Sequence, residues 1–110
     1  MVKKDFYKGS LETILLQIIQ QEGETYGYAL TQKVKELSKG KLKITEGTLY
    51  PLLHRLENDN ILKSELKPYG NRIRKYYKLT TLGEKENAKN LDHFKEFLTQ
   101  MQQLLNLKLV

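Results

Sequence analysis

Hydrophobic side chains recur at helical spacing in three successive segments of the chain. The segment from Ser10 to about Glu22 carries apolar residues three and four positions apart, the pattern of one helix face. Similar stripes run from Thr25 to about Ser38 and from Glu46 to about Asp59. The pattern therefore predicts three amphipathic helices. Residues suited to end them in a left-handed conformation follow each one: Gly23, Gly40 and Asn60.

Several positions refine the ends of these helices. Ser10 and Thr45 carry side-chain oxygens and are expected as N-caps. Gly27 allows two interpretations: close packing against another helix, or an approach of backbone amides to a phosphate. Pro51 removes one backbone hydrogen bond, so an irregular start is expected for the third helix. Leu42 and Ile44 alternate with lysines, which predicts a short strand over residues 41–44.

The pattern changes from helical to extended after the third helix. Residues 61–66 and 72–79 are rich in strand formers, and residues 67–71 between them contain Pro, Gly and Asn. This arrangement predicts a β-hairpin. Tyr76 and Tyr77 are neighbours and point to opposite faces of the strand, so we expect at least one of them in the core.

The last segment predicts one long helix from about Thr81 to the C-terminus. Its apolar side chains are spaced alternately three and four residues apart, which is a heptad seam. Three short helices cannot cover so long an apolar stripe, so we expect the helix to pair with a second copy of itself. The seam residues are Leu91, Phe94, Leu98, Met101 and Leu105, and Phe97 and Leu104 widen it.

Composition narrows the class of protein. The 110 residues fit one small domain, and the absence of cysteine excludes disulfides, thiolate metal sites and cysteine nucleophiles. No stretch resembles a signal peptide or a membrane span, and a cytoplasmic protein with no membrane partner is expected. His54 and His93 lie on different predicted helices without a catalytic or metal-binding spacing. We therefore expect no enzyme activity, no metal and no cofactor.

The positive charge is concentrated in the predicted hairpin. The whole chain has a formal net charge of +6, and residues 61–80 hold six Lys and Arg against one Glu. Such a patch favours a polyanion, most often nucleic acid and less often an anionic membrane, although a solvated strand face without a partner is the alternative. Three helices followed by a basic hairpin form the element order of a winged helix-turn-helix. The expected fold is thus mainly α with a small β-hairpin, with residues 1–80 binding DNA and residues 81–110 forming a dimerisation helix.

Three blocks of sequence resemble the PadR family of transcriptional regulators. They are Tyr26-Gly27-Tyr28, the run EGTLYPLLHRLE over residues 46–57, and RIRKYYKLT over residues 72–80 followed by Gly83. The resemblance implies a winged helix-turn-helix, a homodimer built by the C-terminal helix, and repression at a pseudo-palindromic operator that a small molecule relieves. Only residues 81–110 follow the hairpin, so the chain is similar to the short subgroup with one C-terminal helix. Asn60 stands where the family commonly has glycine, and asparagine also tolerates the left-handed conformation.

The resemblance implies where DNA binds. The start of the third helix meets DNA in this fold, and cations of the hairpin are candidates for phosphate contacts. Arg55 can contact a guanine or a phosphate, or it can pair with Glu57 or Asp59 instead. The expected DNA-binding residues are Thr45, Glu46, Gly47, Thr48, Tyr50, His54, Arg55, Lys67, Arg72, Arg74 and Lys75.

The resemblance also suggests an effector site. Short members of the family bind flat apolar molecules between the two C-terminal helices, against an aromatic side chain. Phe94 stands at the corresponding point and Phe97 lies one turn away, although both residues can equally serve only to pack the dimer seam. The dimer and effector residues expected are Leu91, Phe94, Phe97, Leu98, Met101 and Leu105.

Two functions fit these features. The first is a dimeric, sequence-specific DNA-binding regulator, a repressor of a nearby operon that a small apolar or aromatic effector releases. The second is a winged-helix adaptor that binds an acidic protein and no operator DNA. The polar start of the third helix, residues 45–50, favours the first, because an adaptor has little use for it.

Overall fold

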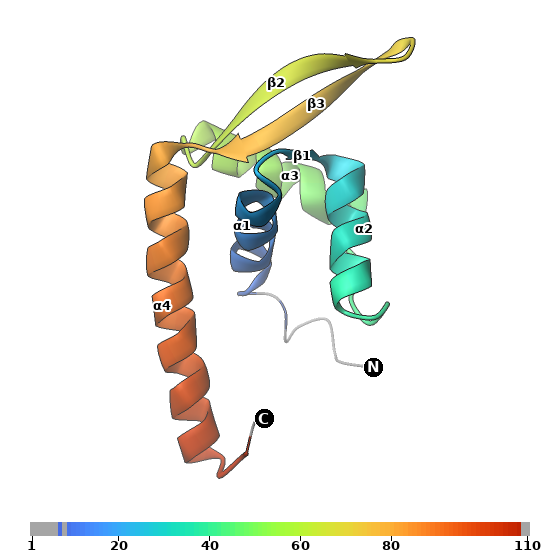
Figure 1. Ribbon diagram of the computed structural model, residues 1–110. Coiled ribbons are helices and arrows are strands. Elements are labelled where there is room, and N and C mark those ends of the chain that lie inside the picture. The colour runs from blue at the N-terminus through green and yellow to red at the C-terminus, as the bar shows by residue number, and fades with distance from the viewer. Residues whose placement is uncertain (1–6, 8, 109–110) are drawn as a thin grey trace.

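Four helices and a small antiparallel sheet make up the fold of the computed structural model, which describes residue 7 and residues 9–108 (Figure 1). Two helices precede α3, and the hairpin and α4 follow it, so the predicted fold class and element order are confirmed. The elements are α1 (Leu11–Glu22), β1 (Thr25–Tyr26), α2 (Gly27–Leu37), α3 (Glu46–Asn58), β2 (Leu62–Tyr69), β3 (Arg72–Leu79) and α4 (Thr81–Leu104).

The sheet has the strand order β1-β3-β2, so β3 is central and β2 lies at an edge. The β2–β3 hairpin, residues 62–79, is called the wing below. Its pairing continues to Tyr69 opposite Arg72, which leaves only Gly70 and Asn71 in the turn. The predicted turn over residues 67–71 was therefore too long. Gly70 has a φ of 58°, which a tight two-residue turn requires, and Pro68 is tolerated because an edge strand can lack one donor.

β1 is a strand that the periodicity did not predict. Thr25 and Tyr26 pair with Tyr77 and Tyr76 of β3, and α2 begins only at Gly27. The predicted helix start at Thr25 was therefore wrong by two residues. The cause lies outside the segment, because its backbone groups bond to a strand fifty positions further along the chain.

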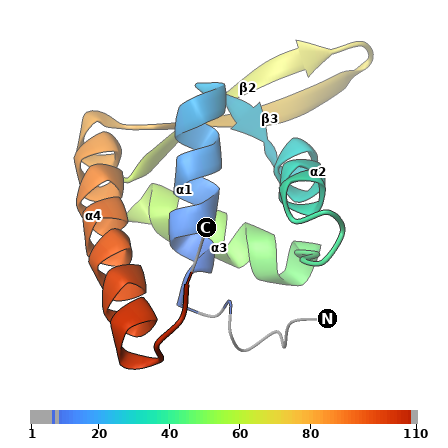
Figure 2. The same ribbon diagram turned by 60° about the horizontal axis from the view of Figure 1, so that its bottom comes forward.

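The core lies between α1, α2, α3 and the inner face of the sheet. Figure 2 shows α1 crossing α3, with α2 on one side and α4 on the other. Tyr77 is only 2% exposed while Tyr76 is half-buried, which confirms that the two rings point to opposite faces. The buried side chains of the three helical stripes are Leu15, Leu16, Ile18, Ile19, Leu30, Val34, Leu49, Leu53 and Leu56.

Residues 41–44 form a loop, so the predicted strand there was wrong. Leu42 and Ile44 are buried and the lysines beside them are exposed, which gives a strand-like alternation without any strand partner. The hydroxyl oxygen of Ser38 accepts a hydrogen bond from the backbone N–H of Leu42 at 2.9 Å and anchors the loop. The alternation of apolar residues and lysines thus arises from a loop that lies across the core.

The predicted helix ends are confirmed in part. Gly23, Gly40 and Asn60 all have positive φ, as predicted. Ser10 and Thr45 stand at the N-cap positions, but neither side chain makes a capping hydrogen bond. The Thr45 hydroxyl instead donates to the Thr48 hydroxyl at 3.2 Å.

The expected irregular start of the third helix does not occur, because α3 is α-helical from its first residue despite Pro51. Gly47, whose carbonyl oxygen loses its partner, and Pro51 are both exposed. Water can therefore satisfy that oxygen.

α4 packs against α1 near its start and then extends beyond it (Figure 1). The Thr80 hydroxyl caps the helix by accepting from the N–H of Gly83 at 2.9 Å. The side-chain amide of the buried Asn87 donates to Gln17 and Gln20 of α1, at 3.0 and 2.6 Å. Within the described residues, no helix combines the length and apolarity that crossing a bilayer requires.

Candidate nucleic-acid interface

A groove of ≈ 560 Å³ opens between the start of α2, one side of α3 and the wing. It brings two of the predicted α3 residues together with three of the predicted wing cations, although they are about twenty residues apart in sequence. Both polar and apolar side chains face it. The lining residues are Tyr26, Gly27, Tyr28, Tyr50, His54, Arg72, Ile73, Arg74, Lys75 and Tyr77.

The exposed face of α3 is opposite its leucine stripe. Gly47, Pro51, His54 and Asn58 follow each other at helical spacing and are all exposed. Thr45 and Glu46 are exposed at the start of the helix, while Thr48 is half-buried. After Glu46, this face carries no Asp, Glu, Lys or Arg, and it has no long side chains. It is therefore a surface that can approach a partner closely.

Gly27 and Tyr50 explain how α2 meets α3. A Cβ atom on Gly27 would lie 2.5 Å from the Tyr50 Oη atom, so any other residue there would displace that ring. Of the two interpretations of Gly27, the structure supports close packing. The contact holds the Tyr50 hydroxyl at the edge of the groove.

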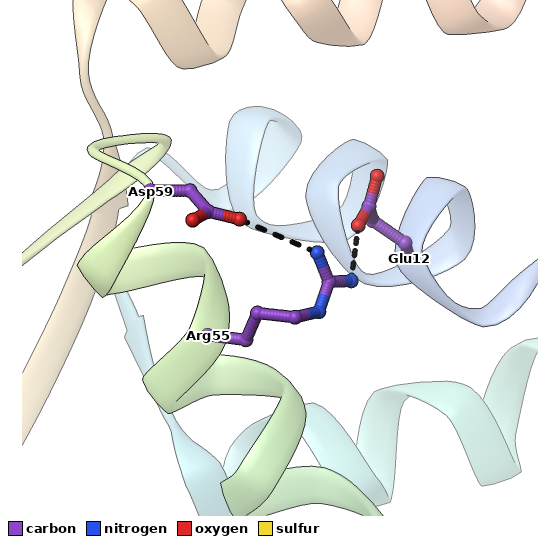
Figure 3. Close-up of polar contacts among 3 residues, drawn as sticks. All are labelled: Glu12, Arg55 and Asp59. Carbon is purple, nitrogen blue, oxygen red and sulfur yellow. Dashed lines mark hydrogen bonds and ion pairs between the residues drawn. The ribbon is translucent and has the colours of Figure 1, made fainter.

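Arg55 lies on the other side of α3 and does not line the groove. Its Nη2 atom is 2.5 Å from Oε1 of Glu12 in α1, and its Nη1 atom is 3.5 Å from Oδ2 of Asp59 (Figure 3). The hydrogen bond to Glu12 raises the pKa of Arg55 most. The pairing with Asp59 was one of the predicted alternatives. The guanidinium is 54% exposed, so these pairs leave part of it open to solvent.

Three of the four predicted wing cations are held by contacts within the chain. Lys67 Nζ lies 2.5 Å from Glu24 Oε1, and Lys75 Nζ lies 3.2 Å from Glu57 Oε1. The Arg74 guanidinium stacks between two rings: its central carbon is 3.8 Å from the centroid of Tyr26 and 3.5 Å from that of Tyr69.

Arg72 differs from these three cations. Among the described residues, no ion pair or ring contact involves it. The wing is thus tied to the body through Glu24, Glu57 and Tyr26, while the cation at its tip stays open.

Glu57 links the end of α3 to the base of the wing. It accepts hydrogen bonds from the Ser64 hydroxyl and from Lys75. The Ser64 hydrogen bond is the main cause that lowers the pKa of Glu57 below its usual 4.5, and Lys75 adds to it against the opposing effect of burial. The ionised carboxylate therefore stabilises the attachment of the wing more than the protonated form does.

We expect Glu57→Gln to flatten the pH dependence of stability in acid. Because folding lowers the pKa of Glu57, its ionised form stabilises the fold above 4.5, and this contribution is lost as the pH falls from 4.5 through the folded-state pKa. Urea unfolding of both proteins between neutral pH and about pH 3 measures the effect. Equal slopes of the unfolding free energy against pH would contradict this role.

The predicted seam residues lie along α4 and the turn that follows it. Leu91, Phe94 and Met101 are half-buried, Leu98 is exposed, and Leu105 is the exposed C-cap residue. The rings of Phe94 and Phe97 stand 6.1 Å apart between centroids. An apolar stripe of this length on one helix is a surface suited to a second helix.

Sequence reasoning missed several residues of this region. Tyr26, Tyr28 and Ile73 line the groove but were not among the predicted contacts. Tyr28 is 65% exposed, and a tyrosine beside a glycine at a helix start is a signal that could have found it. Thr45, Glu46, Gly47, Thr48 and Lys67 lie outside the groove lining. The described residues hold no cluster of metal-ligating side chains.

Comparisons with known proteins agree with this geometry. Residues 15–89 match the model of the Transcriptional regulator PadR-like family. The transcriptional regulator Rv3488 of Mycobacterium tuberculosis is 44% identical over 62 residues, which are 56% of this chain and 55% of that protein. The family and this relative are transcriptional regulators and not enzymes.

Solved structures show the same fold. A PadR-like transcriptional regulator from Bacillus cereus has a TM-score of 0.82 and 31% identity, and the match covers 96% of this chain and all of that one. Bacillus subtilis PadR in complex with operator DNA has a TM-score of 0.67 and 25% identity, over 74% of this chain and 46% of that chain. The chain therefore belongs to the PadR-like family of transcriptional regulators.

Proposed function

We propose that this protein is a dimeric, sequence-specific DNA-binding regulator that represses a nearby operon. The observation that carries the proposal is the groove in which one side of α3 and the cations of the wing meet. A family member solved with operator DNA supports it, because that protein shares this fold. The relatives named above are bacterial, so we place the protein in the cytoplasm, where bacterial DNA lies.

We assign the parts of the interface by their position. The start of α3, residues 45–48, enters the major groove, with Tyr50 and His54 following at its edge. Arg72, Arg74 and Lys75 bind phosphates of the DNA backbone, and Lys67 adds its positive charge from the wing. Arg55 binds a phosphate at the opposite side of α3, where the phosphate replaces Glu12 as the partner of the guanidinium.

The apolar seam along α4 supports the proposed dimer. We assign residues 1–80 to DNA binding and residues 81–110 to dimerisation through Leu91, Leu98, Met101 and Leu105. Two copies present two α3 helices, which fit half-sites about 34–36 Å apart on one side of the duplex. A small apolar or aromatic effector fits beside Phe94 and Phe97, whose ring centroids are 6.1 Å apart on α4.

A gel-shift titration tests the function. The probe is the duplex immediately upstream of the protein's own gene, first at low salt and then with excess unrelated duplex as competitor. Retention of a complex under competition supports an operator-binding regulator. The absence of any shift at low salt contradicts the proposal and favours an adaptor that binds an acidic protein.

We expect Arg72→Ala and Arg74→Ala to weaken binding to operator and unrelated duplexes alike. Each removes a cation from the backbone contacts, so the slope of log K against log salt should fall by about one unit for Arg72. Arg74 also loses its stacking on Tyr26, which loosens the wing. Fluorescence anisotropy over a salt series measures both effects.

The matched control is Lys95→Ala, which removes one positive charge from an exposed position of α4. It should leave the salt slope unchanged. If the wing variants changed only the preference for the operator, the assignment of Arg72 and Arg74 to phosphates would be wrong.

A further inference from the structure

The two faces of the wing differ in character. The strand register places Leu66 opposite Lys75 and Pro68 opposite Ile73, on the same face as Ser64 and Tyr77. This face is directed toward α3, because Ser64 and Lys75 both bind Glu57. The other face carries the tip and edge cations, which include Lys63, Lys67, Arg72, Arg74 and Lys78.

The face toward α3 carries apolar side chains from its base to its tip, interrupted by Ser64 and Lys75, and only its base is covered. Leu62 and Tyr77 at the base are buried in the core. Toward the turn, Leu66 is 65% exposed and Ile73 is 73% exposed, with Pro68 exposed between them. Leu66, Pro68 and Ile73 are called the apolar tip below.

Folding alone does not account for the apolar tip. The wing extends past α3, so no helix covers its outer part (Figure 1), and Ile73 opens into the groove beside His54 and Tyr50. Single exposed apolar residues are common, but three on one face at the end of a basic ribbon form a patch. Cations surround it: Lys75 on the same face, and Arg72 at the end of the ribbon.

We propose that the apolar tip packs against the deoxyribose edges of the DNA strand that lies in the protein groove between α3 and the wing. The inference rests on the proposed function and names a further contact within it. The walls of the minor groove alternate between anionic phosphates and apolar sugar C–H groups, and proteins that bind this groove frequently insert apolar side chains such as Leu, Ile and Pro into it. A surface with an apolar centre and cations around it matches that alternation, with Arg72 and Lys75 on phosphates and Ile73 on the sugars between them.

This contact contributes to affinity in a way that the cations do not. A phosphate contact releases counterions, so its contribution falls as salt rises. Burial of an apolar side chain releases none, and its contribution is nearly the same at every salt concentration. The apolar tip should therefore raise the affinity by nearly the same factor at every salt concentration and leave the slope of log K against log salt unchanged.

The test is the double variant Leu66→Thr/Ile73→Thr, which keeps good strand formers at two exposed positions. Binding to the duplex upstream of the protein's own gene should weaken about five- to tenfold at each salt concentration, with an unchanged slope. Hydroxyl-radical footprinting, which reports the accessibility of the sugars, should lose protection beside the α3 site. Methylation protection of guanines in the major groove should remain.

Matched variants separate the possible results. Arg72→Gln should give the opposite pattern, a flatter salt slope with the sugar protection retained. The single variant Ile73→Thr should lower log K for DNA binding by about half as much as the double variant does. Thermal unfolding of each variant checks that the fold is intact.

An unchanged affinity and an unchanged footprint in a wild type that binds DNA would overturn this inference and leave the proposed function standing. A double variant that binds DNA normally but associates less with itself would also overturn it, because a second copy would then cover the tip. A wild type that binds no DNA overturns the proposed function itself.

Discussion

Replacing Gly83 with alanine is expected to lower the free energy of unfolding by about 3 kcal/mol. Gly83 lies in the first turn of α4, and a Cβ atom there would overlap the carbonyl oxygen of Ile61. That oxygen accepts the backbone N–H of Thr80 at 3.0 Å, so it cannot move without breaking the junction between the end of α3 and the start of α4. The neighbour is backbone, and no side-chain rotation relieves the overlap.

Urea unfolding of the two proteins measures this effect, and Gly47→Ala is the matched control. Gly47 is also a glycine in the first turn of a helix, but its nearest neighbour beyond the helix is the Thr45 hydroxyl oxygen at 4.0 Å. Alanine at Gly47 should therefore raise the stability by about 0.5–1 kcal/mol, because it restricts the unfolded chain. A loss of stability in Gly47→Ala equal to that in Gly83→Ala would show that the close contact is not the cause.

The parts of the fold that could be predicted from the sequence are those that depend on neighbouring residues. The leucine spacing in residues 49–56 specifies a helix face and the face it buries, and the structure buries Leu49, Leu53 and Leu56 as predicted. A glycine in a hairpin turn likewise acts over a few residues. The turn length was overestimated because Pro68 usually marks a turn, and only the strand order shows that it lies at an edge.

The parts that could not be predicted depend on partners distant in sequence. Arg55 pairs with Glu12 and Lys67 pairs with Glu24, in each case across 43 positions. Only the three-dimensional packing of α1 against α3 and of the wing against β1 brings these charges together. Tyr26 joins the groove for the same reason, because its own pairing with β3 places it there.

Leu98→Asp is expected to convert the proposed dimer to a monomer at micromolar concentration. Leu98 lies in the middle of the proposed seam of α4 and is 42% exposed in the single chain. In a dimer its side chain would be buried against the partner helix, and a carboxylate without a counter-charge in such a place costs about 3–5 kcal/mol. That cost corresponds to a dissociation constant raised by about 10²–10³ or more.

Sedimentation equilibrium checks the association state, and Gln100→Asp, an exposed position about half a turn away around α4, is the control that adds the same charge outside the seam. Thermal unfolding of the monomer should retain one cooperative transition, because the core side chains of the first three helices do not include Leu98. Operator binding should weaken by a similar factor, since one wing and one α3 must then bind without the second half-site. A Leu98→Asp protein that remains dimeric at micromolar concentration would show that the seam lies elsewhere. A monomer that binds the full operator as tightly as the wild type would show that the dimer is not what joins the two half-sites.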